Sequence, residues 1–317
     1  MGNHVVVTSI TFGKSATLRE ELVNVFPNSL FNELGIKFSD LELIELLKNA
    51  DAAIIGTEVI SDSILNQAPH LKIISKFGVG LDNIDEESLK NRNIKLGTTG
   101  GVNRRSVSEL TLCFMLGLCR NIFRSGYKLK KSHWEKEGGQ QLTGKTIGVI
   151  GCGYIGSDLV QLLAPLECKL LVNDILDKSD FCRDHGAIQT SLETLITESD
   201  LISLHVPLTK VTKQMVNKSF LNQMKSTAYL VNTSRGNIID QDALKNALKN
   251  NIIAGAALDV FPDEPPADEE FLKLPNLMGT PHIGGNAKEA VLAMGRSAIA
   301  HLVEFFRNHP PNKFRES

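Results

Sequence analysis

Three polar residues in the second half of the chain could together catalyse a proton transfer. Arg235 and Glu264 each follow an apolar run typical of a buried strand, and His282 lies in the sequence Thr-Pro-His-Ile-Gly-Gly. If these runs are parallel strands, the residues after their carboxyl ends gather at one edge of a sheet. There histidine could exchange a proton, glutamate could raise the histidine pKa and fix its tautomer, and arginine could hold an anionic, carbonyl-bearing substrate. Taken singly, each residue is more typical of an exposed loop, so the prediction depends on the three together.

A glycine-rich turn in the middle of the chain could hold a dinucleotide. The β-branched run 146–150 leads directly into Gly-Cys-Gly-Tyr-Ile-Gly at 151–156, after which apolar residues keep helical spacing. This order predicts a strand, a tight turn and a helix. The missing side chain would permit the turn at Gly151, let a pyrophosphate approach at Gly153, and let helix and strand pack at Gly156. The phosphates would accept hydrogen bonds from the free N–H groups at the helix start.

An acidic residue lies where the ribose of a dinucleotide would need one. Asp174 follows the apolar run 169–173 and comes 18 residues after Gly156. A carboxylate there can accept hydrogen bonds from both ribose hydroxyls and would repel a 2′-phosphate, which favours NAD over NADP. The glycine pattern alone also fits an ordinary strand–helix turn, and the acid at this spacing favours the dinucleotide site.

Two series of short apolar runs predict two parallel sheets. Up to residue 100 such runs alternate with helix-like segments, which is typical of βα units and predicts one α/β domain. The expected strands there are 5–7, 52–55, 71–74 and 94–96, and the expected helices are 15–25, 61–67 and 85–90. The second half predicts a doubly wound sheet with strands at 146–150, 169–173, 201–205, 228–232 and 254–259.

Two long helices are predicted around the second sheet. Ser106-Val-Ser-Glu109 has the form of a capping box and is expected to begin a helix that continues to about Phe123. A polar, turn-rich stretch at 128–144 separates that helix from the glycine-rich turn. A closing helix is expected over 287–308, before two prolines.

Composition predicts an ordinary globular protein with small-molecule partners. The chain has 317 residues, 42% of them hydrophobic, enough for a large core and two domains. A formal net charge of −2 gives no reason to expect nucleic acid or an anionic membrane as a partner. The five cysteines form no C-x-x-C pair or zinc spacing, which predicts free thiols and no metal. We find no signal-peptide core and no stretch long enough to span a bilayer, and therefore expect a cytoplasmic protein.

The motifs together resemble the D-isomer-specific 2-hydroxyacid dehydrogenases, and most of all their phosphoglycerate dehydrogenase and hydroxypyruvate or glyoxylate reductase branch. The carrying motifs include Phe-Gly-Val-Gly-Leu-Asp-Asn-Ile-Asp at 77–85 and Val-Asn-Thr-Ser-Arg-Gly at 231–236. They follow one another in the family order over nearly the whole chain. The further matching segments are 101–110, 151–156, 205–209, 256–261 with 264–265, and 281–285.

The resemblance implies a fold and an assembly. An NAD-binding Rossmann domain, residues 101–286, would be inserted in a flavodoxin-like substrate domain made of residues 1–100 and 287–317. Both domains would be doubly wound parallel sheets of the α/β class. The helices after Ser106 and Ala287 would form the hinge. A homodimer would form through the nucleotide domain, around Trp134.

The resemblance also implies a role for each matching residue. Arg235 would bind and polarise a 2-oxo acid, and Glu264 would pair with the general acid and base His282. Backbone amides at Val79 and Gly80 would bind the substrate carboxylate. The implied cofactor contacts are Gly151, Gly153, Tyr154, Ile155, Gly156, Asp174, Thr233, Asp259 at the nicotinamide amide, and His205, Pro207 and Thr209 on the adenine side.

The implied reaction is NAD-dependent hydride transfer to or from C2 of a D-2-hydroxy acid or its 2-oxo form. The substrate stays open between 3-phosphoglycerate, hydroxypyruvate and glyoxylate. Similar phosphoglycerate enzymes have an arginine for the phosphate just after the strand 52–55, where this chain has Ile-Gly-Thr, which weakens the case for a phosphorylated substrate. Lys76 could supply a positive charge near the far end of the substrate, or be a surface lysine at a strand end.

Two alternatives remain. A dehydrogenase fold can serve as an NADH-sensing binding protein, although such a protein has no need to keep Arg235, Glu264 and His282 together. A formate or phosphite type of dehydrogenase on the same scaffold is disfavoured. The formate type would have an extra N-terminal loop and a glutamine before the histidine, where this chain has Pro281.

Overall fold

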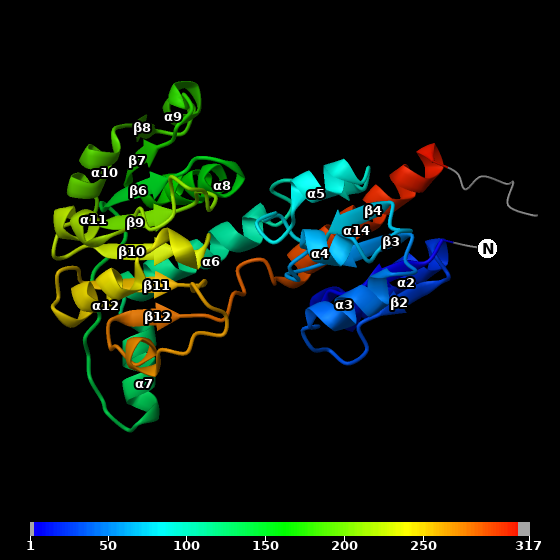
Figure 1. Cartoon of the computed structure of the whole chain (residues 1–317). Helices are drawn as coiled ribbons and strands as arrows, with labels where there is room; N and C mark the ends of the chain where they lie inside the picture. Colours follow the sequence, from blue (N-terminus) through cyan, green and yellow to red (C-terminus); the bar gives the residue numbers. More distant parts are fainter. Residues whose placement is uncertain (1–2, 310–317) are drawn as a thin grey trace, which may run out of the picture. The chain divides into compact units, whose positions relative to one another are not determined.

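The chain forms two compact units, each built around one parallel sheet (Figure 1). The structure is a computed structural model that describes residues 3–309. Unit 1 comprises the chain up to Asn103 together with the chain from Ala287 onward, and unit 2 comprises Arg104–Asn286. Two parallel α/β sheets confirm the predicted fold class.

Unit 1 has a five-stranded sheet with the order β2-β1-β3-β4-β5, all parallel. This is the strand order of flavodoxin-like sheets. The strands are β1 (Val5–Val7), β2 (Ser29–Phe31), β3 (Ala52–Ile55), β4 (Ile73–Lys76) and β5 (Lys95–Gly97). The helices are α1 (Ile10–Lys14), α2 (Ala16–Val25), α3 (Asp40–Leu47), α4 (Asp62–Leu65), α5 (Glu86–Asn91) and α14 (Lys288–Asn308), the last drawn in red in Figure 1.

The last helix closes the core of unit 1. Leu302 of α14 and Leu18 of α2 are fully buried in one cluster with Ile54 of β3. Each such leucine contributes roughly 1.5–3 kcal/mol through burial. The hydroxyl of Ser75 in β4 also donates to the backbone oxygen of Ala298, 3.0 Å away. Helix α14 is therefore an integral part of the first sheet's core.

Unit 2 has a seven-stranded parallel sheet with the order β12-β11-β10-β9-β6-β7-β8. Strand order reverses between β6 and β9, and open α/β sheets bind ligands outside the carboxyl ends at such a point. The strands are β6 (Thr146–Ile150), β7 (Lys169–Asn173), β8 (Ala187–Gln189), β9 (Leu201–Leu204), β10 (Tyr229–Asn232), β11 (Gly255–Leu258) and β12 (Leu277–Gly279). The helices are α6 (Arg104–Cys119), α7 (Ile122–Lys130), α8 (Tyr154–Leu163), α9 (Ser179–Asp184), α10 (Leu192–Glu198), α11 (Lys218–Gln223), α12 (Gln241–Lys249) and α13 (Glu269–Leu272).

The predicted capping box at Ser106 is wrong. Helix α6 already begins at Arg104, and the Ser106 hydroxyl donates to the backbone oxygen of Gly284 at 2.5 Å. The helix also ends at Cys119, before Phe123, because Asn121 takes a left-handed conformation with φ 52°. Helix α7 begins at the next residue, Ile122. The two helices are bent by 67°. The stretch from residue 128, predicted as turn-rich, begins inside α7.

Within residues 3–309, no single helix has the length and apolar character needed to span a membrane. Helices α6 and α7 meet that test only when taken together as a bent pair.

Candidate active site

The glycine-rich turn is shaped by close backbone contacts at two of its three glycines. Gly151 has φ +90°, and an added Cβ would lie 2.7 Å from the backbone oxygen of His205. At Gly156 an added Cβ would lie 2.0 Å from the backbone oxygen of Gly151. At Gly153 a Cβ would meet nothing within 4 Å, so the absent side chain leaves open space at the start of the ten-residue helix α8. The first and third glycines are required by the fold, and the second leaves room for a phosphate.

Asp174 lies beside this turn, at the end of β7. Its Oδ2 accepts a hydrogen bond from the backbone N–H of Cys152 at 2.6 Å, and its Oδ1 accepts one from Leu176 at 2.9 Å. The neighbouring strand β6 ends at the same edge, in register with β7. The carboxylate is thereby fixed against the turn, where the ribose of a dinucleotide is expected.

His205 directly follows β9, the neighbour of β6 at the point where strand order reverses, and its backbone oxygen lies next to Gly151. The ring Nε2 is hydrogen bonded to the Ser203 hydroxyl at 2.8 Å, whereas the buried Nδ1 has no hydrogen-bond partner within the described chain. Burial lowers the pKa of His205 to about 3, so the ring is neutral. Pro207 and Thr209 follow in a loop closed by Thr212, whose hydroxyl donates to the Pro207 oxygen at 2.6 Å.

The Arg235 turn is built on the buried Asn232. The Asn232 side chain donates to the backbone oxygen of Arg235 at 2.9 Å and accepts from the backbone N–H of Ser234 at 3.0 Å. Gly236 packs so closely that an added Cβ would lie 2.0 Å from the backbone carbon of Phe261. The turn that carries Arg235 is therefore in direct backbone contact with the loop that carries Glu264. Asn232 and Gly236 were not predicted as positioning residues; a polar residue at the end of a buried strand is the signal that could have identified Asn232.

Thr233 lies in the same turn and is anchored by helix α6. Its hydroxyl is hydrogen bonded to that of Thr111 at 2.9 Å, and both side chains are buried. This bond fixes one side of the strand end next to Arg235.

His282 and Glu264 form a hydrogen-bonded pair. Nδ1 of His282 lies 2.7 Å from Oε2 of Glu264, whose Oε1 accepts from the backbone N–H of Phe261 at 3.1 Å. The bond to Glu264 raises the pKa of His282 above its ordinary value, against the opposing effect of burial. Burial is the largest single influence on Glu264 and pushes its pKa upward, but the bond to His282, the charges of His282 and Arg235 and the bond from Phe261 together outweigh it and leave that pKa lowered. Arg235 lies close enough to lower the pKa of both groups. With Nδ1 committed to Glu264, Nε2 is the ring nitrogen that can face a substrate.

Asp259 lies directly after β11 and is only 1% exposed. Its carboxylate accepts hydrogen bonds from the loop 280–284, which holds His282. The structure thus brings Arg235, Asp259, Glu264 and His282 together on three neighbouring strand ends of unit 2.

The predicted substrate contacts Val79 and Gly80 lie in unit 1, in the loop after β4. Lys76 ends that strand, and its side chain is not at the surface, because the residue is only 5% exposed. Its Nζ donates to the backbone oxygen of Gly56 and to Oδ1 of Asn83, the latter at 2.7 Å. Asn83 in turn donates to the backbone oxygen of Glu58 at 2.5 Å. The surface-lysine interpretation of Lys76 is therefore wrong.

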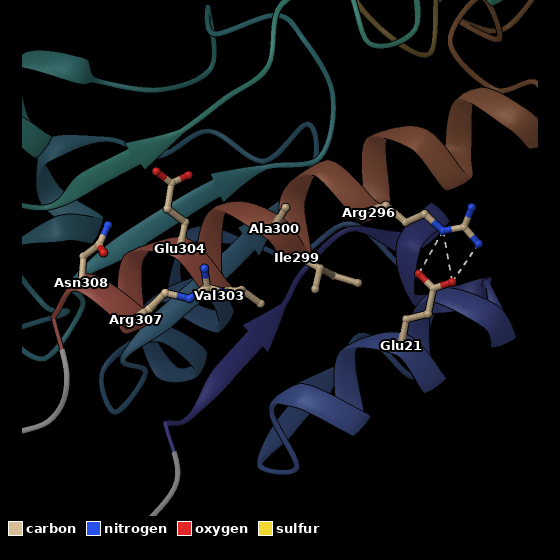
Figure 2. Close-up of a pocket in the computed structure, with 8 residues that line it drawn as sticks. All are labelled: Glu21, Arg296, Ile299, Ala300, Val303, Glu304, Arg307 and Asn308. Atoms are coloured by element: carbon tan, nitrogen blue, oxygen red, sulfur yellow. Dashed lines mark hydrogen bonds and ion pairs between the residues drawn. The ribbon is translucent and has the colours of Figure 1, made fainter.

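A shallow pocket on unit 1 does not belong to this site. Figure 2 shows it along α14, where Arg296 forms an ion pair with Glu21 of α2, with Nη2 and Oε1 2.8 Å apart. None of the predicted site residues line it. Among residues 3–309, no three His, Cys, Asp or Glu side chains are grouped as a metal site would need.

Known proteins share both the sequence and the fold. The NAD-binding domain model of the D-isomer-specific 2-hydroxyacid dehydrogenases matches residues 112–284. A glyoxylate reductase of Thermococcus litoralis is 37% identical over 281 residues, 85% of this chain and 85% of that protein. A D-3-phosphoglycerate dehydrogenase of Methanocaldococcus jannaschii is 36% identical over 92% of this chain but only 56% of its own length. A D-lactate dehydrogenase of Aquifex aeolicus, solved with NAD and lactic acid, is 27% identical with a TM-score of 0.84 over 96% of each chain. The chain therefore belongs to the D-isomer-specific 2-hydroxyacid dehydrogenases, which are NAD-dependent oxidoreductases.

Proposed function

We propose that this chain reduces short, unphosphorylated 2-oxo acids of the glyoxylate and hydroxypyruvate kind. One observation carries the proposal: Nδ1 of His282 lies 2.7 Å from Oε2 of Glu264. The loop that carries Glu264 is in backbone contact with the turn that carries Arg235. This group offers a proton donor, a carboxylate that orients it, and a cation for an anionic substrate. The similarity to the glyoxylate reductase of T. litoralis supports the substrate class.

In this proposal His282 gives the proton from its Nε2 to the carbonyl oxygen of the 2-oxo acid. The Glu264 carboxylate stabilises the imidazolium before the transfer and fixes the ring orientation. The Arg235 guanidinium binds the substrate carboxylate and polarises the carbonyl. NADH, held by the turn 151–156 and Asp174, would supply the hydride for C2 of the substrate. In the oxidation direction His282 accepts the hydroxyl proton.

The cofactor contacts that we propose follow the edge of the second sheet. The pyrophosphate would lie on the turn 151–156, where Gly153 leaves open space and where Tyr154 and Ile155 begin helix α8. Asp174 would accept hydrogen bonds from the ribose. The remaining contacts are Thr233 and Asp259 toward the nicotinamide and His205, Pro207 and Thr209 toward the adenine.

We further propose that unit 1 is the substrate domain. The backbone N–H groups of Val79 and Gly80 would bind the substrate carboxylate, next to Gly78, whose φ of +131° few residues other than glycine adopt. Lys76 would border the far end of the substrate. Its ammonium group already donates to Gly56 and Asn83, so it offers less to a doubly charged phosphate than a bidentate arginine would.

A second candidate substrate is 3-phosphoglycerate, or its 2-oxo form. The similarity to the M. jannaschii D-3-phosphoglycerate dehydrogenase favours it. The buried Lys76 is the cation that we expect near the far end of the substrate, where the phosphate would lie. Against it, Ile55-Gly56-Thr57 offers no arginine after β3. We therefore rank it second.

Oxidation of NADH and NADPH, followed by absorbance against a panel of 2-oxo acids, tests the proposal. Glyoxylate or hydroxypyruvate should give the highest kcat/KM with NADH. His282→Ala should lower kcat by roughly 10²-fold or more, and Arg235→Ala should mainly raise KM while also lowering kcat. The exposed neighbour Asp263, changed to Asn, is the control. Tight NADH binding without turnover of any panel member would favour the sensor instead, and a preference for the phosphorylated acid would favour the second candidate.

We also propose that the chain forms a homodimer through α7 and the segment that follows it. None of the residues of α7 are buried, and Ile122, Phe123, Tyr127 and Leu129 are each more than half exposed, as is Trp134 at 77%. Clustered exposed apolar side chains of this size mark an interaction surface. Light scattering should give the mass of two chains, and Phe123→Asp with Trp134→Ser should give the mass of one. An unchanged mass would refute this surface as the dimer contact.

A reducing, cytoplasmic setting remains our prediction for this enzyme. All five cysteines are free thiols in the structure, and three of them are buried. Proteins of oxidising compartments usually pair their cysteines.

A further inference from the structure

The loop that carries His282 is built around one residue, Asp259. Its Oδ1 accepts hydrogen bonds from the Thr280 hydroxyl at 2.5 Å and from the backbone N–H of Ile283 at 2.8 Å. Its Oδ2 accepts one from the backbone N–H of Gly284 at 2.7 Å. The backbone oxygen of Asp259 accepts the N–H of His282 itself, also at 2.8 Å. Donors on both sides of the histidine are thus directed at a single aspartate.

This arrangement explains how His282 keeps an unusual backbone conformation. Its φ is +53°, a left-handed value that only a few per cent of residues other than glycine adopt. Such a conformation persists only where the surroundings fix it. Pro281 adds no donor of its own, and an added Cβ at Gly284 would lie 2.9 Å from Asp259 Oδ2. The sequence around the histidine is therefore fitted to the buried carboxylate.

We propose that Asp259 is a positioning residue, whose carboxylate holds His282 in the left-handed conformation that presents Nδ1 to Glu264 and leaves Nε2 for the substrate. The proposal rests on the proposed function only where it speaks of substrate. The expected contact with the nicotinamide amide is a separate role. A carboxylate has about four acceptor positions and the loop uses three, so one position is left for the nicotinamide amide. The two roles can be told apart, because the first acts on the His282 pKa and the second on the affinity for NADH.

The charges around His282 give the direction of the effect. The imidazole faces Glu264 and Asp259, which raise its pKa, and Arg235, which lowers it. Removing the Asp259 charge lowers the pKa of His282, and loosening the bond to Glu264 lowers it as well. Without Asp259, the pKa of His282 should therefore fall.

The test is the pKa of His282, measured by NMR titration of the full chain without cofactor or substrate. In Asp259→Asn we expect it to fall by on the order of one unit, with kcat at least roughly tenfold lower. The affinity for NADH relative to ADP-ribose, which lacks the nicotinamide, measures the separate contact of Asp259 with the nicotinamide amide and should also fall. Asp200→Asn is the matched control. Asp200 accepts the backbone N–H of Thr146 at 2.9 Å, at the opposite end of the same sheet. Its loss should leave the His282 pKa unchanged.

Two milder variants keep the test decisive if Asp259→Asn does not fold. Thr280→Val removes only the hydroxyl donor, and Gly284→Ala displaces Oδ2; both should lower the His282 pKa and kcat in the same direction. An unchanged His282 pKa in all folded variants would overturn the proposal. So would weaker binding of NADH than of ADP-ribose in Asp259→Asn with an unaltered His282 pKa, because that pattern belongs to a nicotinamide contact. Since the titration needs no turnover, its result is independent of whether the proposed reaction occurs.

Discussion

Replacing Glu264 with Gln should move the pH range in which His282 can donate a proton. A hydrogen bond to a charged group contributes about 1.5–3 kcal/mol and a neutral one about 1 kcal/mol. The charged and neutral bonds differ by about 0.5–2 kcal/mol. The two side chains are 41% and 37% exposed, so water screens the pair and a value in the lower half of that range applies. We take a loss of about 1 kcal/mol, which corresponds to about 0.7 of a pKa unit.

The direction of the pKa shift follows from the hydrogen bond between Glu264 and His282. Glu264 raises the pKa of His282, so the protonated imidazole needed for reduction persists to higher pH in the wild type. In Glu264→Gln that pKa falls. At pH values above both pKa values, kcat/KM for reduction should be about fivefold lower, while below them the two enzymes should converge. For oxidation, which needs the neutral ring, the profile should move in the same direction and activity should begin at lower pH.

The assay is the pH profile of kcat/KM in both directions for the wild type, Glu264→Gln and the control Asp263→Asn. Asp263 is an exposed carboxylate one residue away, so its profile should match the wild type. If the midpoint of the pH profile of kcat/KM stays in place or moves to higher pH in Glu264→Gln, the assigned role of the pair is refuted. A midpoint that moves equally in the control would show only a general effect of charge.

Four further substitutions or treatments test other parts of the structure. Gly236→Ala must separate the Arg235 turn from the backbone at Phe261, so a folded variant should lose roughly tenfold or more in kcat; steady-state rates equal to the wild type would contradict the contact. Asp174→Ala should raise KM for NADH and reduce the preference over NADPH, as measured with both cofactors; an unchanged ratio would remove Asp174 from the ribose site. Leu302→Ala should lower the free energy of unfolding by about 2–5 kcal/mol in urea titrations, because the leucine is fully buried; a smaller loss would mean that its site collapses. Cys152 should react slowly with alkylating reagents in the folded protein, as followed by mass spectrometry, since burial raises its thiol pKa; rapid labelling would show an open turn.

The central strands could be predicted from the sequence because they are buried on both faces. The predicted strands 5–7, 52–55, 146–150 and 169–173 coincide with β1, β3, β6 and β7. The missed strands are β2, β8 and β12, three of the four outermost strands of the two sheets. Each has three residues with mixed burial, and therefore no continuous apolar run to detect. Helices α1, α3 and α9 to α13 were not predicted either.

The site could be predicted as a set of residues but not as an arrangement. Residue types after strand ends pointed to Arg235, Glu264 and His282, and the structure places Glu264 and His282 in contact. The contacts that position them join residues far apart in the chain, as Asp259 does with Gly284. Local pattern carries no signal for such contacts. Ser106 shows the opposite error, because a local capping pattern is overruled by a hydrogen bond to Gly284.

The acid–base chemistry proposed here is contained within unit 2. The bonds that set the orientation of His282 come from Glu264 and Asp259, and the turn that carries Arg235 is held by Asn232; all of these lie between Arg104 and Asn286. Val79, Gly80 and Lys76 lie in unit 1 and have no part in those bonds. Substitutions in unit 1 should therefore change KM and the choice of 2-oxo acid while leaving the His282 pKa in the free enzyme unaltered. Substitutions around Asp259 should do the reverse, so the two effects can be separated in one set of pH profiles.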